Sequence, residues 1–188
     1  MIRIGIIGDI GSGKSFVAKN FGYPVFNADL EVGKLYKKNK KIFVKLKKIL
    51  PKYFNTYPIK KNEVSQAILD NKNNLVKIVK IIHFEVRKKM NTFLKKNKNK
   101  EFVVLDIPLL LENKINKRND VLIFVQSQKK EILKRLRKRK NFNKKLTDKF
   151  RNIQLPIDYK KKKSHFVIKN NFTKKSVKIQ INNILKNI

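Results

Sequence analysis

Short apolar runs alternate with amphipathic stretches along this chain, and the alternation predicts a parallel α/β sheet. Apolar, β-branched residues at 2–7 end in a glycine cluster, which indicates a buried strand followed by a helix from about Lys14. Further apolar runs that suit buried strands lie at 25–26, 102–105, 121–125 and 166–168. Short buried strands alternating with helices indicate an α/β domain.

The middle third of the chain shows helical periodicity and no clear strand. Pro51 ends an amphipathic stretch at 41–50, because proline cannot continue a helix. Helical spacing continues over 63–94 and in a basic stretch at 129–163, which breaks near Asn141-Phe142-Asn143 and at Pro156. The helical pattern that starts at Asp29 places four apolar side chains on one side, namely Leu30, Val32, Leu35 and Tyr36.

Composition limits the class of protein. The chain has 188 residues, which suits one domain, and its 41% hydrophobic content is too high for a disordered basic tail. It has no cysteine, which excludes a disulfide scaffold and a cysteine-ligated zinc site. We find neither a membrane-length apolar run nor a cleavable leader, so we expect a soluble, cytoplasmic protein.

Charge is the most unusual feature of the composition. Lys and Arg number 48 against 13 Asp and Glu, which gives a formal net charge of +35, and 41 of the 48 are Lys. Because lysine codons are rich in A and T, we interpret the excess as genome composition and lysine runs such as 160–163 as solvated surface. A nucleic-acid patch is the alternative, but these runs lack interleaved aromatic residues. A positive field also favours small anionic substrates.

Residues 8–15 carry the motif that points to chemistry. Their sequence, GDIGSGKS, fits G-x-x-x-x-G-K-[ST] and lies between a predicted strand and a predicted helix. Backbone N–H groups of such a loop face phosphate oxygens, its lysine reaches the β- and γ-phosphates, and its serine helps hold Mg²⁺. The alternative is a glycine turn with a chance Lys-Ser pair. The nucleoside triphosphate site predicted here comprises Gly8, Gly11, Ser12, Gly13, Lys14, Ser15 and Phe16.

Two acidic residues follow predicted strands, at the edge where ligands bind in open α/β sheets. A carboxylate at Asp29 would accept a hydroxyl proton or align an acceptor for attack on the γ-phosphate; the alternative is that it caps its helix. Asp106 is placed like an acid that binds Mg²⁺, and the alternative is a strand-end turn residue. An Asn-Lys-x-Asp element in register is absent, which argues against a GTPase.

Arg135, Arg137 and Arg139 form a cluster in a chain with only seven arginines. Guanidinium groups make paired hydrogen bonds to phosphate oxygens, so the cluster fits a segment that closes over a nucleotide. It equally fits a solvated helix face. His83 lies in an apolar helical pattern, where a partly buried, hydrogen-bonded histidine is the common outcome.

These elements resemble the dephospho-coenzyme A kinase family over nearly the whole chain. The loop at 8–15 looks like the family's glycine-rich loop, and Asn27-Ala28-Asp29 resembles its Asp-Ala-Asp element. The most family-specific match is the DIPLLLE segment at 106–112, which is similar to the family's Pro-Leu-Leu-Phe-Glu signature. Further similar segments are Ile81-Ile82-His83, Arg135-Leu136-x-x-Arg139, Gln154-x-Pro156 and Phe166-Val167-Ile168-x-Asn170.

The resemblance implies transfer of the ATP γ-phosphate to the ribose 3′-hydroxyl of dephospho-CoA, giving CoA and ADP. It also implies a P-loop fold similar to nucleoside monophosphate kinases, with a five-stranded parallel sheet flanked by helices. The implied parts are a core at about 1–29, 100–128 and 164–188, a helical substrate region at about 30–99 and a lid at about 129–163. The implied roles are catalysis by Lys14, Asp29 and Arg139, nucleotide binding by Arg135, substrate binding by Asp29, His83 and Leu109, and Mg²⁺ binding by Ser15 and Asp106.

Several positions depart from the family pattern. Asn27 replaces the first acid of Asp-Ala-Asp, and Gly33, Lys61 and Phe84 stand where a basic residue or His, Arg and Pro are usual; these four departures concern substrate contacts rather than the reaction. In the loop, Asp9 stands where glycine is usual and Phe16 where Thr is frequent, and phosphate binding by the loop backbone tolerates both as long as the neighbouring glycines remain. His165 stands where Asp is typical, and no role is assigned to it.

Two other functions fit parts of the sequence. Another P-loop kinase, acting on a nucleoside monophosphate or another small molecule, would share the loop, but the segment at 106–112 and Asp29 argue against it. A P-loop RNA-binding protein would use the charge instead. We expect a small-molecule substrate, no membrane or nucleic-acid partner, and a monomer or weak oligomer.

Overall fold

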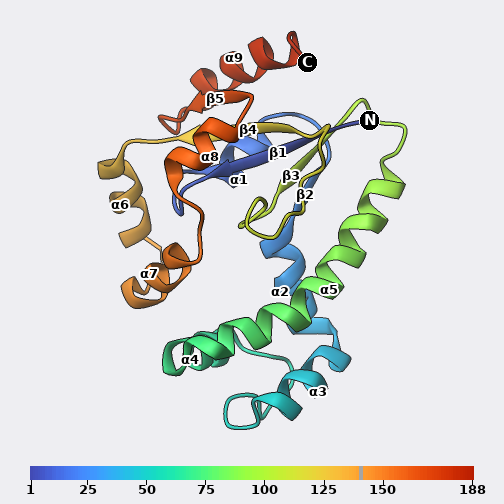
Figure 1. Cartoon of the computed structure of the whole chain (residues 1–188), viewed down its shortest axis with the longest axis vertical. Helices are drawn as coiled ribbons and strands as arrows, with labels where there is room; N and C mark the ends of the chain where they lie inside the picture. Colours follow the sequence, from blue (N-terminus) through green and yellow to red (C-terminus); the bar gives the residue numbers. More distant parts are fainter. Residues whose placement is uncertain (140–141) are drawn as a thin grey trace. The chain divides into compact units, whose positions relative to one another are not determined.

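Five parallel strands form one sheet in the computed structural model, which describes residues 1–139 and 142–188 (Figure 1). The strands are β1 (Ile2–Gly8), β2 (Val25–Asn27), β3 (Phe102–Asp106), β4 (Val121–Gln126) and β5 (Phe166–Lys169). Their order across the sheet is β2-β3-β1-β4-β5, and every neighbouring pair is parallel. The predicted parallel α/β sheet is therefore confirmed, and the carboxyl ends of all its strands meet at one edge.

Helices connect the strands and fill the middle of the chain. They are α1 (Lys14–Lys19), α2 (Ala28–Lys38), α3 (Lys40–Ile49), α4 (Lys61–Asp70), α5 (Lys72–Lys96), α6 (Lys129–Arg137), α7 (Lys144–Asn152), α8 (Ile157–Lys163) and α9 (Lys174–Leu185). Of the predicted breaks, Asn141 lies outside the described residues, whereas Phe142 and Asn143 precede α7 and Pro156 is the N-cap of α8, so the breaks at these three residues are confirmed. Within the described ranges, no helix combines the length and apolar composition that crossing a membrane requires.

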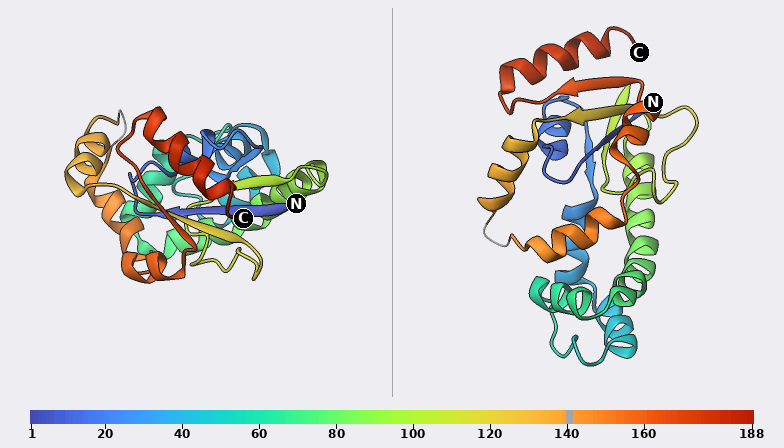
Figure 2. Two further views of the ribbon diagram at one scale, coloured as in Figure 1. Left: turned by 90° about the horizontal axis from the view of Figure 1, so that it is seen from above. Right: turned by 60° about the vertical axis from the view of Figure 1, so that its left-hand side comes forward.

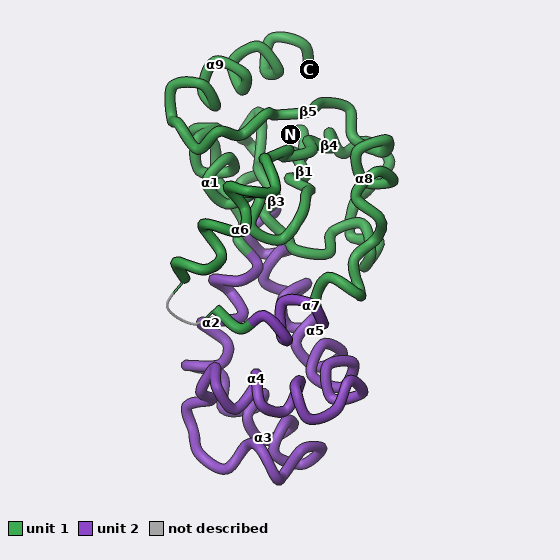
Figure 3. Tube along the Cα trace, turned by 90° about the vertical axis from the view of Figure 1, so that its left-hand side faces the viewer, with its two compact units in different colours: residues 1–27, 97–143, 150–188 green, residues 28–96, 144–149 purple. Residues whose placement is uncertain are grey.

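The chain divides into two compact units, which have different colours in Figure 3. Unit 1 comprises residues 1–27, 97–143 and 150–188, and unit 2 comprises residues 28–96 and 144–149. Unit 1 contains the whole sheet. In unit 2, α5 packs against α2, α3 and α4. Fully buried side chains of unit 2 include Leu46, Phe54 and Ala67.

The alternation of side chains along the strands gives the sheet two apolar faces. One face, which carries Ile4 and Ile6, packs against α1 and α9, and α9 runs beside β5 (Figure 2). Helix α8 contacts β1 and β4. Gly5 leaves room for two leucines, because a Cβ atom there would lie 2.7 Å from Leu110 and 2.9 Å from Leu122. The sheet is thus covered as its continuous apolar strands require.

The apolar side predicted for α2 is wrong at Leu30. Its side chain is 60% exposed, whereas Leu35 and Tyr36 are buried. Each helical residue turns by about 100°, so Leu30 points about 140° away from Leu35. Leu30 therefore cannot share the buried side of the helix with Leu35.

A buried ion pair fastens β1 to the loop that precedes β4. Arg3 Nη2 lies 2.9 Å from Asp120 Oδ2 and also donates to the carbonyl oxygen of Ile115 at 3.2 Å. The Asp120 carboxylate accepts the backbone N–H of Lys117 at 2.9 Å. Burial raises the pKa of Asp120, while the Lys117 N–H and the charge of Arg3 oppose that rise. Each charge is tolerated because the other neutralises it.

Replacing Asp120 with alanine should lower the free energy of unfolding by about 3–5 kcal/mol, because Arg3 would keep a buried charge without its partner. Urea denaturation measures the change. The double variant Arg3→Met/Asp120→Ala should recover most of the loss. The exposed Asp158→Ala serves as the control and should change stability by about 1 kcal/mol at most. An Asp120→Ala protein as stable as this control would contradict the prediction.

Candidate active site

The predicted phosphate-binding loop connects β1 and α1, and its shape depends on Gly13. This residue is the N-cap of α1 and has a φ of 90°, in the left-handed region that favours glycine. A Cβ atom there would lie 2.7 Å from Cε1 of Phe172 and would overlap the side-chain amide of Asn170. A larger residue at position 13 would therefore displace the chain that follows β5.

Two side chains at the carboxyl ends of β4 and β5 hold this loop. Ser127 Oγ and Asn170 Nδ2 each donate to the carbonyl oxygen of Ser12 at 2.8 Å. Asn170 is 4% exposed, and its Oδ1 accepts the backbone N–H of Phe172 at 2.8 Å. Ser12 itself is buried. The sequence predicted Ser12 as a site residue but assigned no role to Ser127 or Asn170; the signal for Asn170 was its place at the end of the family-like segment at 166–170.

Lys14 and Ser15 place a cation and a hydroxyl at the end of the loop. Lys14 Nζ donates to the carbonyl oxygens of Gly8 at 3.2 Å and Asp9 at 2.9 Å. Ser15 is exposed in the first turn of α1. The loop thus presents an ammonium group and an accessible hydroxyl, which is the chemistry that phosphate and a bound cation require.

An arginine and two aromatic rings gather next to Gly13. The guanidinium carbon of Arg135 lies 3.7 Å from the ring centroid of Phe172, and the Phe172 and Phe16 centroids are 6.4 Å apart. The first distance is that of cation–π stacking. Phe172 therefore links Arg135 and Phe16, two residues that the sequence predicted. It was missed because it is one of 13 phenylalanines and lies in no motif.

Asp106 lies buried at the end of β3 and is hydrogen-bonded to Asn27. It is 3% exposed, and its Oδ2 accepts a hydrogen bond from the side-chain amide of Asn27, its register partner on β2. An aspartate at position 27 would instead place a second carboxylate against the first. Asn27, which departs from the family pattern, thus gives the Asp106 carboxylate a hydrogen-bond donor.

Two residues predicted to contact the acceptor substrate lie in unit 2. Asp29 is exposed in the first turn of α2, two residues after Asn27. His83 lies on α5 and is partly buried. Burial lowers the pKa of His83, and the positive charge of Arg87 lowers it further. The functional roles of Asp29 and His83 stay predictions.

The remaining predicted residues, Leu109 and Arg139, lie in unit 1. Leu109 has a φ of 60°, and its carbonyl oxygen accepts the backbone and side-chain N–H groups of Asn113 at 3.1 and 3.0 Å. Arg139 is exposed shortly after α6 and directly precedes residues 140–141. The binding role of Leu109 and the catalytic role of Arg139 stay predictions.

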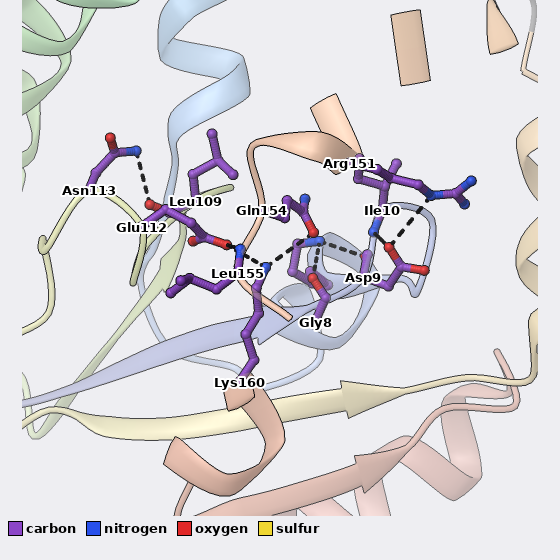
Figure 4. A network of polar contacts seen from close by, with 11 residues as sticks. Gly8, Asp9, Ile10, Leu109, Glu112, Asn113, Arg151, Gln154, Leu155 and Lys160 are labelled. Atoms are coloured by element: carbon purple, nitrogen blue, oxygen red, sulfur yellow. Dashed lines mark hydrogen bonds and ion pairs between the residues drawn. The ribbon is translucent and has the colours of Figure 1, made fainter. Parts of the chain in front are cut away.

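Glu112 anchors the chain that follows α7 (Figure 4). Its carboxylate forms an ion pair with Lys160 at 2.6 Å and accepts the backbone N–H of Leu155 at 3.0 Å. Lys160 also donates to Gln154 Oε1 at 3.1 Å and is only 3% exposed. The interpretation of residues 160–163 as solvated surface is therefore wrong at Lys160. Its buried ammonium is tolerated because Glu112 neutralises it.

Comparison with known proteins gives matches over the whole chain. The family model for dephospho-CoA kinase matches residues 2–176. A dephospho-CoA kinase from Wolbachia sp. subsp. Brugia malayi (strain TRS) is 34% identical over 190 residues, covering 98% of this chain and 97% of that protein.

Solved structures share the fold. TT1252 from Thermus thermophilus aligns with a TM-score of 0.77 and 25% identity, covering 100% of this chain and 97% of that one. Dephospho-CoA kinase from Campylobacter jejuni aligns with a TM-score of 0.63 and 19% identity, covering 98% and 96%. These alignments confirm the predicted fold, a five-stranded parallel sheet flanked by helices.

Replacing Asn170 with aspartate should weaken ADP binding by about tenfold, because an oxygen would replace the amide that donates to Ser12 and a buried hydrogen bond would be lost. Isothermal titration calorimetry measures the dissociation constant. Asn171→Asp is the matched control, since the Oδ1 of Asn171 accepts the Thr173 backbone N–H and hydroxyl groups and an aspartate keeps such an oxygen. Equal affinities of the two variants would show that the Asn170 contact does not shape the loop.

Acidification should destabilise the protein partly through His83. Its pKa is lowered in the folded state, so below the unfolded value of about 6.5 the unfolded chain binds the proton more tightly and stability falls as pH falls. The unfolding free energy, measured by urea denaturation from pH 7.5 to 5, should decrease less in His83→Asn than in the unchanged protein. Parallel pH profiles would refute the contribution of His83.

Proposed function

This chain belongs to the dephospho-CoA kinase family, and from that membership we propose how its residues phosphorylate dephospho-CoA. The reaction transfers the γ-phosphate of ATP to the ribose 3′-hydroxyl, giving CoA and ADP. A bond forms between the hydroxyl oxygen and the γ-phosphorus while the bond to the bridging β,γ-oxygen breaks. The observation that carries the proposal is the family match over residues 2–176, which includes the loop at 8–15 and Asp29.

The loop and its neighbours bind ATP. Backbone N–H groups of the loop and the ammonium of Lys14 bind the phosphates, and Arg139 neutralises charge on the transferred group. Arg135 and Phe172, already stacked on each other, offer flat surfaces for the adenine base, with Phe16 beside them. Their contribution is to position the triphosphate and to neutralise its charge.

Asp29 acts on the acceptor. Its exposed carboxylate accepts the proton of the ribose 3′-hydroxyl or aligns that oxygen with the γ-phosphorus. His83 and Leu109 contact dephospho-CoA. The positive net charge of the chain favours this substrate because it carries a pyrophosphate group.

Mg²⁺ fits the oxygen donors near the loop. The hydroxyl of Ser15 and the carboxylate of Asp106 are the hard oxygen ligands that Mg²⁺ prefers. In the described part of the chain, no three acidic or histidine side chains gather as a metal cage. Mg²⁺ needs none, because it binds one or two protein ligands together with phosphate oxygens and water. When bound, it would neutralise phosphate charge, with Ser15 and Asp106 holding it.

Action as a monomer or weak oligomer in the cytoplasm stays a prediction from the sequence. The small-molecule acceptor follows from membership of the family.

Replacing Asp29 with asparagine should lower the rate of CoA formation by about 10²–10⁴-fold, because the amide cannot accept the hydroxyl proton. CoA and ADP production from ATP, Mg²⁺ and dephospho-CoA is measured, with adenosine monophosphate as the alternative acceptor. Glu31→Gln is the matched control, since it removes a second acid from the same first turn of α2.

The control should keep its activity within about twofold, because Glu31 pairs with the exposed Lys34 and such surface pairs contribute little. An Asp29→Asn enzyme as active as the control would remove Asp29 from the mechanism. Phosphorylation of adenosine monophosphate in preference to dephospho-CoA would point to a different acceptor.

A further inference from the structure

An acidic residue occupies the phosphate-binding loop and has an arginine beside it (Figure 4). Asp9 is one of only 13 acidic residues in the chain. Its Oδ1 accepts the backbone N–H of Ile10 at 2.6 Å and lies 3.9 Å from Arg151 Nε. The Asp9 side chain is only 20% exposed. The carboxylate is therefore held within the loop rather than extended into solvent.

A carboxylate in this position opposes the binding of phosphate. Like charges repel, and water and salt screen this repulsion less at a partly buried site than on an open surface. The backbone carbonyl of the same residue accepts a hydrogen bond from Lys14 Nζ, so Asp9 lies beside the ammonium group that is predicted to bind phosphate. The negative charge of Asp9 would repel a triphosphate in the loop unless another group neutralises that charge.

Arg151 is built into a segment that keeps it near Asp9. It lies close to the end of α7, and the chain just after it is bound to the partly buried Glu112 through the Leu155 N–H and Lys160. Gln154, three residues after Arg151, accepts a hydrogen bond from the same lysine. These contacts hold the chain that follows Arg151 in place, and thereby the arginine near Asp9.

We propose that Arg151 is the charge partner of Asp9 and that it maintains nucleotide affinity by neutralising this carboxylate, without itself binding phosphate. Arg151 is then a positioning residue. Nucleotide binding requires it only because Asp9 places a negative charge where the family loop usually has glycine. The inference rests on the proposed function in one respect, which is that the nucleotide phosphates occupy the loop at 8–15.

Binding of ADP with Mg²⁺, measured by isothermal titration calorimetry without dephospho-CoA, tests the proposal in a set of variants. Arg151→Gln should bind ADP about 3- to 30-fold more weakly, because the negative charge of Asp9 would no longer be neutralised and would repel the phosphates. Asp9→Asn/Arg151→Gln should return to within about twofold of the unchanged protein. The asparagine keeps an acceptor for the Ile10 N–H, so the loop retains that contact. Arg151→Lys, which restores the charge, should also bind normally.

Arg118→Gln is the control, since it removes the same charge from an exposed position in unit 1. Restored affinity in the double variant, with normal affinity in Arg118→Gln, supports the proposal. A double variant as weak as Arg151→Gln overturns it, because Arg151 would then bind phosphate directly or support the fold. Equal affinity of Arg151→Gln and Arg118→Gln also overturns it. Failure to form CoA would refute the proposed acceptor without changing this comparison.

Discussion

The two hydrogen bonds to the carbonyl oxygen of Ser12 are the contacts on which the phosphate-binding loop depends. They come from Ser127 and Asn170, at the carboxyl ends of the two strands that follow β1 across the sheet. The parallel register, in which Gly8 pairs with Val125 and Gln126 with Lys169, brings these ends to one edge. The sheet therefore positions the loop. Gly13 of the loop fits against Asn170 because glycine has no side chain.

A few paired charges organise unit 1 of a chain whose formal net charge is +35. Arg3, Asp120 and Lys160 are buried, and the Arg3–Asp120 and Lys160–Glu112 pairs each bind one segment of the chain to another. Such pairs fix geometry because breaking one leaves an uncompensated charge in a poorly hydrated site. The exposed lysines act differently: they contribute a positive field that attracts anionic substrates and falls off with salt.

Local patterns along the sequence determined the strands, the loop motif and the family. A buried strand is a short apolar run and a phosphate loop is eight consecutive residues, so both can be recognised without knowing what lies beside them. The five parallel strands and the family match bear this out. The same local reasoning places Leu30 wrongly, because Leu30 and Leu35 lie about 140° apart around the helix and cannot share its buried side.

Tertiary structure alone decided which residues support the loop and the buried charges. Asn170 and Ser12 are 158 positions apart, so no sequence spacing predicts their contact. In the run at 160–163 all four residues are lysine, and the contacts with Glu112 and Gln154 distinguish the buried Lys160 from the others. In the same way, only the tertiary contact with Arg135 distinguishes Phe172 as a residue of the site. Sequence periodicity reports which face of an element is apolar, whereas these contacts depend on which distant segments the fold brings together.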